Sequence, residues 1–401
     1  MIDVSSKIPE YVSAIIKQLK SAGFEAYIVG GCIRDILLGR YPGDWDVCTS
    51  ALPDEVTDTL CGYKVIKTGI AHGTVTAIKN KDICEITTFR CDGKYADHRR
   101  PDNVVFTRSL RDDLARRDFS VNAMAFSEET GIVDLYNGQQ DLKNRTIRCV
   151  GIPETRFTED SLRILRALRF SSVLNFQIEP STAQAMFLCS DLIAFVAKER
   201  IYQELKKLLC GSSAYRILQD YKSIIFKFLN CSELENNAHF LRNATQEFSL
   251  RYALLFYNAS IDVALHNLSN LKADKKTINE VEFLIKNNSK NHFRDSQSIK
   301  KALSSFGKEK TKKLFDYVSI THNFPENKKC NIQTLIEELP VITLKELEIN
   351  GNDIINLGFK KGVEIKKILN LALNAVLQNN CKNEKTVLIE FILREKKKVT
   401  N

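Results

Sequence analysis

The chain has 401 residues, of which 44% are hydrophobic, and its 58 Lys and Arg exceed its 49 Asp and Glu to give a formal net charge of +9. This length exceeds the size at which single hydrophobic cores stop growing, so we expect two or more domains. The 11 cysteines are an odd number without a Cys-x-x-Cys pair, which argues against a disulfide framework and a structural zinc site. Because the N-terminus lacks a signal-peptide pattern and no apolar run reaches the length of a membrane span, we expect a cytoplasmic protein with no membrane partner.

The excess positive charge lies in the second part of the chain. Residues 1–150 carry 20 Lys and Arg against 21 Asp and Glu, whereas residues 151–401 carry 38 against 28. A neutral head joined to a basic body suits binding of a polyanion through its phosphates. Lysine-rich helices on an ordinary solvated surface would give the same counts, so charge alone leaves RNA binding open.

The periodicity of the hydrophobic residues changes near residue 150. Before it, short runs rich in Val, Ile, Thr and Tyr alternate with turns, as in an α/β domain. The predicted strands are residues 26–29, 63–67, 74–79, 83–89 and 123–127. From Thr158 onward helical periodicity dominates. The predicted helices are residues 181–188, 199–209, 213–228, 246–257, 274–286, 296–306, 308–320, 331–338, 352–357 and 362–377.

A glycine turn follows the first predicted strand. The sequence GGCIRDILLG at residues 30–39 indicates a Gly-Gly turn and a short amphipathic helix that Gly39 closes. Such a turn lets backbone N–H groups approach a phosphate, and the helix dipole and Arg34 favour its negative charge. We therefore expect Gly30, Gly31 and Arg34 to bind a triphosphate.

Three carboxylates lie in two strand-like stretches, Asp44 and Asp46 in GDWDV and Glu85 in ICEITT. Alternating strand positions share a face, so Asp44 and Asp46 should converge, and a neighbouring strand can bring Glu85 beside them. A hard divalent cation such as Mg2+ would make three like charges on one face tolerable. A solvated edge strand or turn is the alternative explanation of the Asp-x-Asp pair.

The polar segment DGKYADHRRPD at residues 92–102 interrupts the strand pattern. We expect it to form a mobile loop beside the carboxylate-bearing strands. A plain surface loop is the alternative.

A row of charged residues follows Thr158, which we expect to cap a helix. Asp160, Arg163, Arg166 and Arg169 each lie three positions apart, so successive members are neighbours on this helix and the row winds slowly around it. On spacing alone, a salt-bridge ladder on the helix surface is the alternative.

Taken together, these motifs resemble those of the class II tRNA nucleotidyltransferase and bacterial poly(A) polymerase family. The first motif combines GGCIRDILLG with GDWDVCT at residues 43–49. Further matches in the order of the family are RRDFSVNA at 116–123, Asp134 to Leu142, EDSLRILRALRF at 159–170 and KERI at 198–201. The match is specific up to about residue 210 and looser beyond it. Ser120 and Asn137 stand where the family often has Thr and Gly, and neither change conflicts with the assignment.

The resemblance implies a role for each motif residue. Asp44 and Asp46 would hold two Mg2+ ions, with Glu85 aiding the ion that activates the primer 3′-hydroxyl. Arg117 would join the glycine turn in contacting the triphosphate. The ribose would lie near Asp118 and Asn122, whose polar groups can recognise a 2′-hydroxyl. In the family, a loop such as residues 92–102 accompanies addition of the final A.

Asp160 and Arg163 would recognise the incoming base as a partner base does. Cytosine and adenine both present an amino donor next to a ring-nitrogen acceptor, whereas uracil and guanine present a carbonyl next to an N–H. An acceptor carboxylate beside a donor guanidinium therefore fits C and A, and leaves U and G with opposed donors. Arg166 and Arg169 would continue the row towards phosphates or hold Asp160 in place.

The expected fold is an α/β nucleotidyltransferase head with a polymerase-beta-like palm, followed by an all-α neck, body and tail. The predicted domains are a catalytic head at residues 1–150, a base-selecting neck at 151–210, a body at 211–330 and a tRNA-binding tail at 331–401. Within the tail, residues 351–362 look like the tail segment of the family.

The expected activity is template-independent addition or repair of the 3′-terminal CCA of tRNA from CTP and ATP, with release of pyrophosphate and without an obligate protein partner. A poly(A) polymerase, an enzyme that adds only CC or only A, and a non-catalytic RNA-binding protein remain alternatives. The segment 92–102 argues against CC addition alone, and three intact carboxylates argue against a non-catalytic protein.

Overall fold

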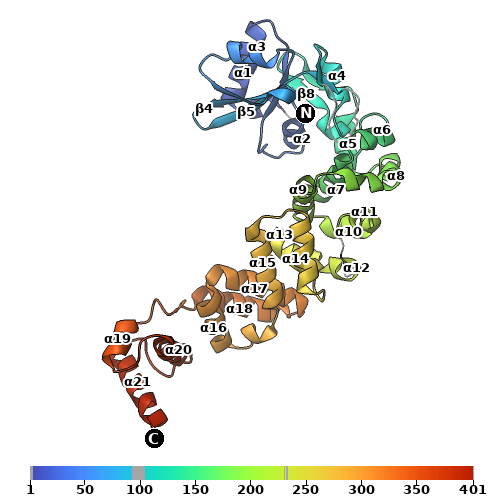
Figure 1. Ribbon diagram of the computed structural model, residues 1–401. Coiled ribbons are helices and arrows are strands. Elements are labelled where there is room, and N and C mark those ends of the chain that lie inside the picture. Colours follow the sequence, from blue (N-terminus) through green and yellow to red (C-terminus); the bar gives the residue numbers. More distant parts are fainter. Residues whose placement is uncertain (1–2, 93–103, 230, 232–233, 401) are drawn as a thin grey trace. The chain divides into compact units, whose positions relative to one another are not determined.

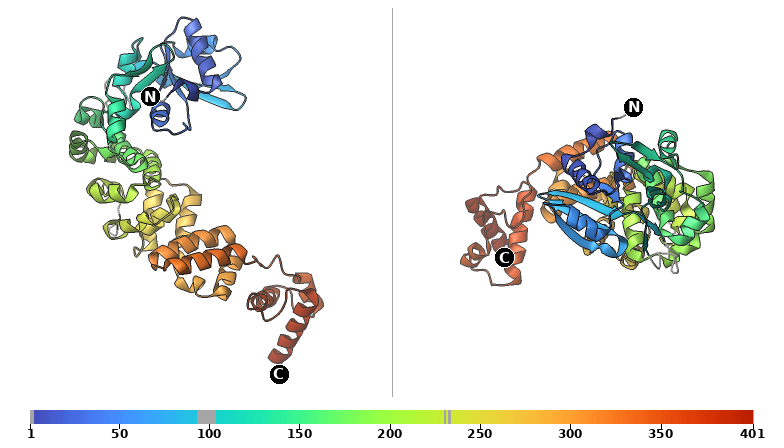
Figure 2. Two further views of the ribbon diagram at one scale, coloured as in Figure 1. Left: turned by 180° about the vertical axis from the view of Figure 1, so that it is seen from behind. Right: turned by 90° about the horizontal axis from the view of Figure 1, so that it is seen from above.

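The computed structural model describes residues 3–92, 104–229, 231 and 234–400. The strands lie mostly in the blue part of the chain, and the green to red parts are almost entirely helical in each view (Figure 1, Figure 2). This arrangement confirms the predicted class of fold, an α/β head followed by helices. Among the described residues, none of the helices combines the length and the apolar character that crossing a membrane requires.

The head is built on a seven-stranded sheet with the order β3-β4-β5-β2-β1-β8-β9. Its strands are β1 (Ala26–Val29), β2 (Asp46–Thr49), β3 (Lys64–Gly69), β4 (Thr74–Lys79), β5 (Asp82–Thr88), β8 (Met124–Ser127) and β9 (Gly131–Asp134). Strands β2 and β5 run parallel, and the other neighbours in this sheet run antiparallel. The five strands predicted from the sequence all form, within two residues of their predicted ends.

Two short ribbons lie outside this sheet. The strands β6 (Arg90–Asp92) and β7 (Val104–Phe106) pair antiparallel, and β10 (Thr146–Ile147) pairs with β11 (Gln177–Ile178). Residues 93–102 of the predicted loop lie outside the described residues, so its role stays a prediction.

Helices α1 (Glu10–Ser21) and α3 (Pro53–Thr59) lie on one side of the sheet (Figure 1). The apolar positions of α1 follow a helical period, and Val12, Ile15 and Leu19 are fully buried. The opposite face packs near β1 against α4 (Leu110–Ala115).

The predicted helix from Thr158 is wrong at its start. Thr158 lies in the last turn of α6 (Pro153–Glu159), and the backbone is extended at Asp160, with φ −137° and ψ 98°. The next helix, α7 (Leu162–Leu174), begins only after this break. Proline favours the first turn of a helix, so Pro153 starts α6 early enough for it to end before Asp160.

The remaining helices follow in chain order. They are α2 (Gly31–Leu37), α5 (Gly138–Asn144), α8 (Pro180–Leu188), α9 (Lys198–Leu209), α10 (Ala214–Asp220), α11 (Lys222–Ile225), α12 (Leu234–Asn237), α13 (Phe248–Leu255), α14 (Ile261–Asn270), α15 (Lys275–Lys286), α16 (Ser296–Phe306), α17 (Lys308–Thr321), α18 (Glu326–Glu338), α19 (Gly351–Asn356), α20 (Val363–Leu377) and α21 (Lys385–Thr400). The single helix predicted for residues 213–228 is therefore wrong, because the chain leaves the helical conformation at Tyr221, between α10 and α11.

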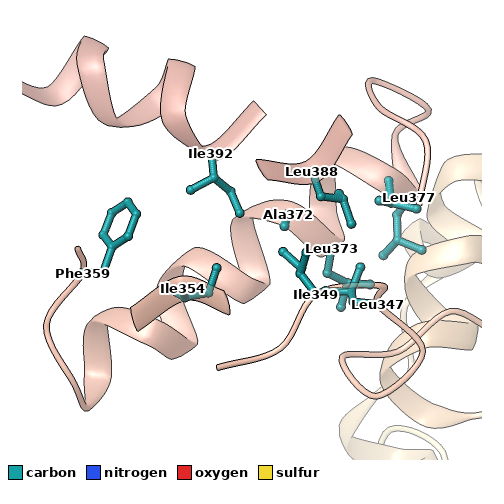
Figure 3. Packing of buried hydrophobic residues seen from close by; sticks show 10 residues of the cluster. Leu347, Ile349, Ile354, Phe359, Ala372, Leu373, Leu377, Leu388 and Ile392 are labelled. Atoms are coloured by element: carbon teal, nitrogen blue, oxygen red, sulfur yellow. The ribbon is translucent and has the colours of Figure 1, made fainter. Parts of the chain in front are cut away.

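The chain forms two compact units. One contains Met1–Ala238 and His266–Ala273, and the other contains His239–Leu265 and Asp274–Asn401. The end of the second unit has a core of its own, in which Ile354, Leu388 and Ile392 are almost fully buried (Figure 3). The finer boundaries predicted at residues 150, 210 and 330 stay predictions.

Helices α7 and α9 pack closely where the chain turns after α9. A Cβ atom added at Gly211 would lie 2.1 Å from the Oγ of Ser172 and 2.7 Å from its carbonyl carbon. We therefore expect Gly211→Ala to push the helices apart and to destabilise the first unit by about 1–3 kcal/mol. Thermal unfolding would measure this loss. Gly43→Ala, at a position with no atom within 4 Å of the added Cβ, should leave Tm unchanged.

Candidate active site

A cleft of about 800 Å3 lies in the first unit, where the sheet meets α7. Its lining is strongly basic, since it includes eight arginines and four aspartates. The lining residues are Gly30, Gly31, Arg34, Asp44, Asp46, His72, Arg90, Arg116, Arg117, Asp118, Asn122, Asp160, Leu162, Arg163, Arg166, Arg169, Phe170 and Arg200. Twelve of the thirteen residues predicted from the sequence line this one cleft, and Glu85 does not.

The predicted carboxylates occupy two elements and one loop. Asp46 begins β2 and lies opposite Glu85 of β5 in the parallel ladder. Asp44 precedes the strand, so the prediction that it alternates with Asp46 along one strand is wrong. The buried Trp45 holds this loop against the protein, and Asp44 still reaches the cleft beside Asp46.

Asp46 is placed where its negative charge is unfavourable in the metal-free protein. Burial, together with the charges of Glu85 and Asp44, raises the pKa of Asp46 to about 6, although Arg117 opposes the shift. Within the described residues, no group of three Asp, Glu, His or Cys side chains has the arrangement of a complete metal site. Two acidic side chains that share a cleft, one of them with a raised pKa, nevertheless offer the oxygen donors that a hard divalent cation requires.

Arg117 stands between the glycine turn and Asp46. Gly30 has a φ of +83°, and a Cβ added there would lie 3.2 Å from the Nη1 of Arg117. Glycine is therefore required at this position both for its backbone conformation and for the close approach of the guanidinium. The Nε of Arg117 is buried and has no hydrogen-bond partner among the described residues, which leaves a donor for an anion in the cleft.

Hydrogen bonds link Arg34 to Arg166 through two side chains. The Nη1 of Arg34 donates to the Oδ1 of Asn122 at 2.7 Å, and the Nδ2 of Asn122 donates to Asp118 at 3.1 Å. The Nε of Arg166 donates to the other oxygen of Asp118 at 2.7 Å. Burial alone would raise the pKa of Asp118, but Arg166, Asn122 and the N–H of Phe119 lower it to about 2.

Phe170 is an aromatic platform for three guanidinium groups. The Cζ atoms of Arg34, Arg166 and Arg169 lie 5.3, 5.4 and 3.9 Å from its ring centroid. Such contacts stabilise cations over the ring face. The Nε of Arg169 also lies 3.0 Å from the buried carboxylate of Glu204 on α9. Burial and the charges of Arg166 and Arg34 lower the pKa of Arg169 to about 10, against the effect of Glu204.

Asp160 occupies the break between α6 and α7. Its Oδ1 accepts a hydrogen bond from the N–H of Leu162 at 3.2 Å, and its Oδ2 lies 3.2 Å from Arg200 of α9. Asp160 therefore caps α7 and is held by Arg200. Holding Asp160 was one of the two roles expected for Arg166 and Arg169, and these arginines pair instead with Asp118 and Glu204.

Arg163 is almost fully buried beside this break. Its Nη1 donates to Glu159 at 2.9 Å and to the carbonyl of Arg156 at 3.2 Å, and its Nη2 donates to the carbonyl of Arg116 at 3.1 Å. Asp160, Arg163, Arg166 and Arg169 form four ion pairs with residues outside their own helix or segment. The row of charged residues that follows Thr158 is therefore not a salt-bridge ladder along one exposed helix face, which was the alternative explanation of its spacing.

The sequence reasoning missed several residues that shape the cleft. Asp113, whose side chain is 0% exposed, lies 2.7 Å from Arg116 and 3.0 Å from Arg117. Burial alone would raise the pKa of Asp113, but the two arginines lower it. An acid three and four residues before a basic pair was a visible signal. The other missed residues are His72, Arg90, Arg116, Phe170, Arg200 and Glu204, of which Arg116, Phe170 and Arg200 lie in the motifs of the sequence.

We expect Asp113→Asn to raise KM for the two nucleotides that the resemblance implies, CTP and ATP, by a similar factor of about 10-fold to 100-fold, because Arg116 and Arg117 lose the carboxylate that orients them. Steady-state kinetics with both nucleotides would measure the change. Asp112→Asn is the matched control, since Asp112 lies on the same helix and its side chain accepts from Thr107. Equal losses in the two variants would contradict this role of Asp113.

Comparisons with known proteins agree with this geometry. The family model described as the poly A polymerase head domain matches residues 26–148, and that of tRNA nucleotidyltransferase domain 2 matches residues 244–392. The CCA-adding enzyme of Staphylococcus epidermidis is 35% identical over 403 residues, with 97% of this chain and 98% of the relative covered. The CCA-adding enzyme of Lactococcus lactis subsp. cremoris, strain SK11, is 38% identical, with 96% of each chain covered.

A solved structure gives the same assignment. The crystal structure of the Bacillus stearothermophilus CCA-adding enzyme in complex with CTP aligns with a TM-score of 0.84 and 31% identity, and the alignment covers 97% of this chain and 98% of that one. Sequence identity above 30% over nearly the whole length accompanies the shared fold and the motif-lined cleft. The chain therefore belongs to the family of CCA-adding enzymes.

Proposed function

We propose that this protein adds or repairs the 3′-terminal CCA of tRNA, using CTP and ATP and releasing pyrophosphate. The observation that carries the proposal is that Asp44 and Asp46 share one cleft with Asp160, Arg163 and a wall of arginines. Acidic side chains for a metal, cationic donors for phosphates and a base-reading pair are the components that template-independent nucleotide transfer requires. The Bacillus stearothermophilus relative was solved in complex with CTP, which supports nucleotide binding by this chain.

Mg2+ is the cofactor that fits the acidic end of the cleft. Asp44 and Asp46 would hold it, and Glu85, which lies opposite Asp46 on the neighbouring strand β5, would assist. Bound there, the metal would lower the pKa of the primer 3′-hydroxyl and neutralise charge on the leaving pyrophosphate. The proposal includes two Mg2+ ions, the number that the resemblance implies.

The basic wall positions the nucleotide. Arg34, Arg117 and the Gly30-Gly31 turn would bind the triphosphate, because the buried Nε of Arg117 has no partner among the described residues and the turn permits close approach. Asp118 and Asn122 would contact the ribose hydroxyls from the hydrogen-bonded link described above. These contacts do not depend on the base, so they serve CTP and ATP equally.

Base selection falls to Asp160 and Arg163. Asp160 accepts hydrogen bonds, and Arg163 donates them, so the pair matches the donor-acceptor edge that C and A share. Arg200 and the α7 N-terminus hold Asp160, and Glu159 holds Arg163. A pair fixed in this way selects without a nucleic-acid template because its own geometry replaces the template base.

The helices after the neck would hold the tRNA. The family model for tRNA nucleotidyltransferase domain 2 covers residues 244–392, and residues 151–401 carry the net positive charge. We therefore assign the head at 1–150 to catalysis, the neck at 151–210 to base selection, and the body at 211–330 and the tail at 331–401 to tRNA. We place the enzyme in the cytoplasm, where tRNA and both nucleotides occur.

The test is extension of a tRNA transcript that ends at the discriminator base. Purified protein with Mg2+ and CTP should add CC, and one A should follow when ATP is also present, after which addition should stop. Long A tracts on any RNA would instead identify a poly(A) polymerase. Arrest at CC, or action only on CC-ended tRNA, would identify a partial enzyme, and no addition would favour a binding protein.

A further inference from the structure

The motif at residues 134–142 contributes no residue to the described lining of the cleft, yet its side chains have specific partners. At the end of β9, the carboxylate of Asp134 accepts hydrogen bonds from the N–H groups of Gly138 at 2.8 Å and Gln139 at 2.9 Å. An acid placed in this way satisfies the free N–H groups of the first helical turn. It thereby anchors the start of α5, the helix that carries Asp141.

Asp141 is a buried acid that binds a buried hydroxyl. Asp141 is 2% exposed, and its partner Ser120 is 1% exposed. The Oγ of Ser120 donates a hydrogen bond to the Oδ2 of Asp141 at 2.5 Å, and the Nε of Arg148 donates to the same oxygen at 3.2 Å. Loss of either donor would leave a buried charge less compensated, so this contact constrains the position of Ser120.

The backbone of α5 also lies against Ser120. A Cβ atom added at Gly138 would lie 2.4 Å from the carbonyl oxygen of Ser120 and 2.9 Å from the Cγ of Met124. Only glycine permits such a close approach of two backbone segments. One helix therefore fixes Ser120 through two contacts, one with its side chain and one with its backbone.

Ser120 lies midway between the two side chains assigned to the ribose, Asp118 and Asn122. The N–H of Ser120 donates to the carbonyl of Arg148 at 2.9 Å, and the N–H of Val150 donates to the carbonyl of Asp118 at 3.1 Å. Ser120 also begins the 3₁₀ helix that ends at Asn122. Because Asp118 and Asn122 each stand only two residues away, a shift of Ser120 would move the backbone from which both ribose contacts extend.

We propose that Ser120 and Asp141 are a positioning pair, which holds Asp118 and Asn122 where they discriminate ribonucleotides from deoxyribonucleotides. This inference rests on the proposed function, in which Asp118 and Asn122 contact the ribose hydroxyls. A hydrogen bond to the 2′-hydroxyl weakens steeply when its donor and acceptor lose their distance and alignment. A nucleotide without that hydroxyl has no such contact to lose, so a displaced Ser120 lowers the preference for the ribonucleotide.

The test compares CTP with dCTP in the first addition to a tRNA transcript that ends at the discriminator base. Ser120→Ala should lower kcat/KM for CTP about tenfold and leave kcat/KM for dCTP nearly unchanged, so the ratio of the two falls about tenfold. Ser120→Thr keeps the hydroxyl and should retain the wild-type ratio. Assays run below the Tm of each variant keep unfolding out of the comparison, and a general loss of stability would lower both values together.

Asp141→Asn tests the acceptor of the same hydrogen bond. It should also lower the ratio of CTP to dCTP, and the double variant with Ser120→Ala should show a smaller fall than the product of the two single falls, because both changes weaken one contact. Ser127→Ala is the matched control. Ser127 is a buried serine of β8, 2% exposed, whose hydroxyl lies 2.9 Å from that of Thr130, so its loss should leave the ratio unchanged.

The outcomes separate this inference from the proposed function. An unchanged ratio in Ser120→Ala, or a fall of equal size in Ser120→Thr or Ser127→Ala, would overturn the inference. If the wild-type protein adds no nucleotide to tRNA, the proposed function fails. If the wild-type protein adds CTP and dCTP equally well, nucleotide addition stands and the positioning of ribose contacts by Asp141 is wrong.

Discussion

Asp46→Asn is expected to reduce nucleotide addition about 10³-fold or more and, at the same time, to raise Tm in metal-free buffer at pH 7. The loss follows from removing a charged oxygen donor at the metal end of the cleft. The gain in stability follows from the raised pKa of Asp46, because an ionised carboxylate there is buried beside Asp44 and Glu85. Extension assays and thermal unfolding, each with and without Mg2+, would measure the two effects.

The sign of the pH dependence provides a further check. The pKa of Asp46 rises from 3.8 to about 6 on folding, so the folded protein binds this proton more tightly than the unfolded chain. Its contribution to stability is present below about pH 4 and is lost as the pH rises through 6. The Asp46→Asn substitution removes that dependence, so the two proteins should differ more in Tm at pH 7 than at pH 4.

Asp54→Asn is the control for this experiment. Asp54 is an exposed carboxylate of α3 that pairs with Lys67 outside the cleft, and its loss should change neither activity nor the response to Mg2+. If Asp46→Asn kept wild-type activity, or if it lowered Tm as much as a core substitution does, the assignment of Asp46 to the metal would be wrong.

Asp160→Asn is expected to lower kcat/KM for CTP and ATP about 100-fold and to narrow the discrimination against UTP. The amide offers a donor where the carboxylate offers only acceptors, so it can face the carbonyl of uracil. It also weakens the contact with Arg200, which lies 3.2 Å from Asp160. Single-nucleotide incorporation with CTP, ATP, UTP and GTP would measure the change in selectivity.

Glu199→Gln provides the matched comparison on α9. Glu199 is an exposed acid next to Arg200 and does not line the cleft, so its variant should select as the wild type does. A parallel loss for all four nucleotides in Asp160→Asn, with unchanged ratios, would show that Asp160 acts on the structure of the α6–α7 break rather than on the base.

Much of the candidate active site could be predicted from the sequence, because the local order of residues determines where its turn and its flanking elements lie. Gly30 follows an apolar strand and Gly31 begins a helix, and that order alone places a tight turn at the end of β1. Strands β4 and β5 could be read from alternation because one of their faces is buried and the other is not. Twelve predicted residues consequently line one cleft.

Other features depended on contacts between distant residues and could not be read from local pattern. The helical period of residues 159–170 continues through Asp160, so nothing in the spacing reveals that the chain is extended there. The break is stabilised by Arg200, 40 residues away, and by the bond from Leu162 to the Asp160 carboxylate. Glu204 was missed for the same reason, since only the packing of α9 on α7 brings it to Arg169.

The link from Asn122 through Asp118 to Arg166 has a consequence for fidelity. It ties the polar groups expected at the sugar to α7, the helix whose first turn Asp160 caps, across 48 residues of sequence. A base that strains the α7 N-terminus must therefore disturb the sugar contacts as well. Ribose recognition and base recognition would then be thermodynamically coupled. A nucleotide with both the wrong sugar and the wrong base would be rejected by a factor that differs from the product of the factors for each error alone.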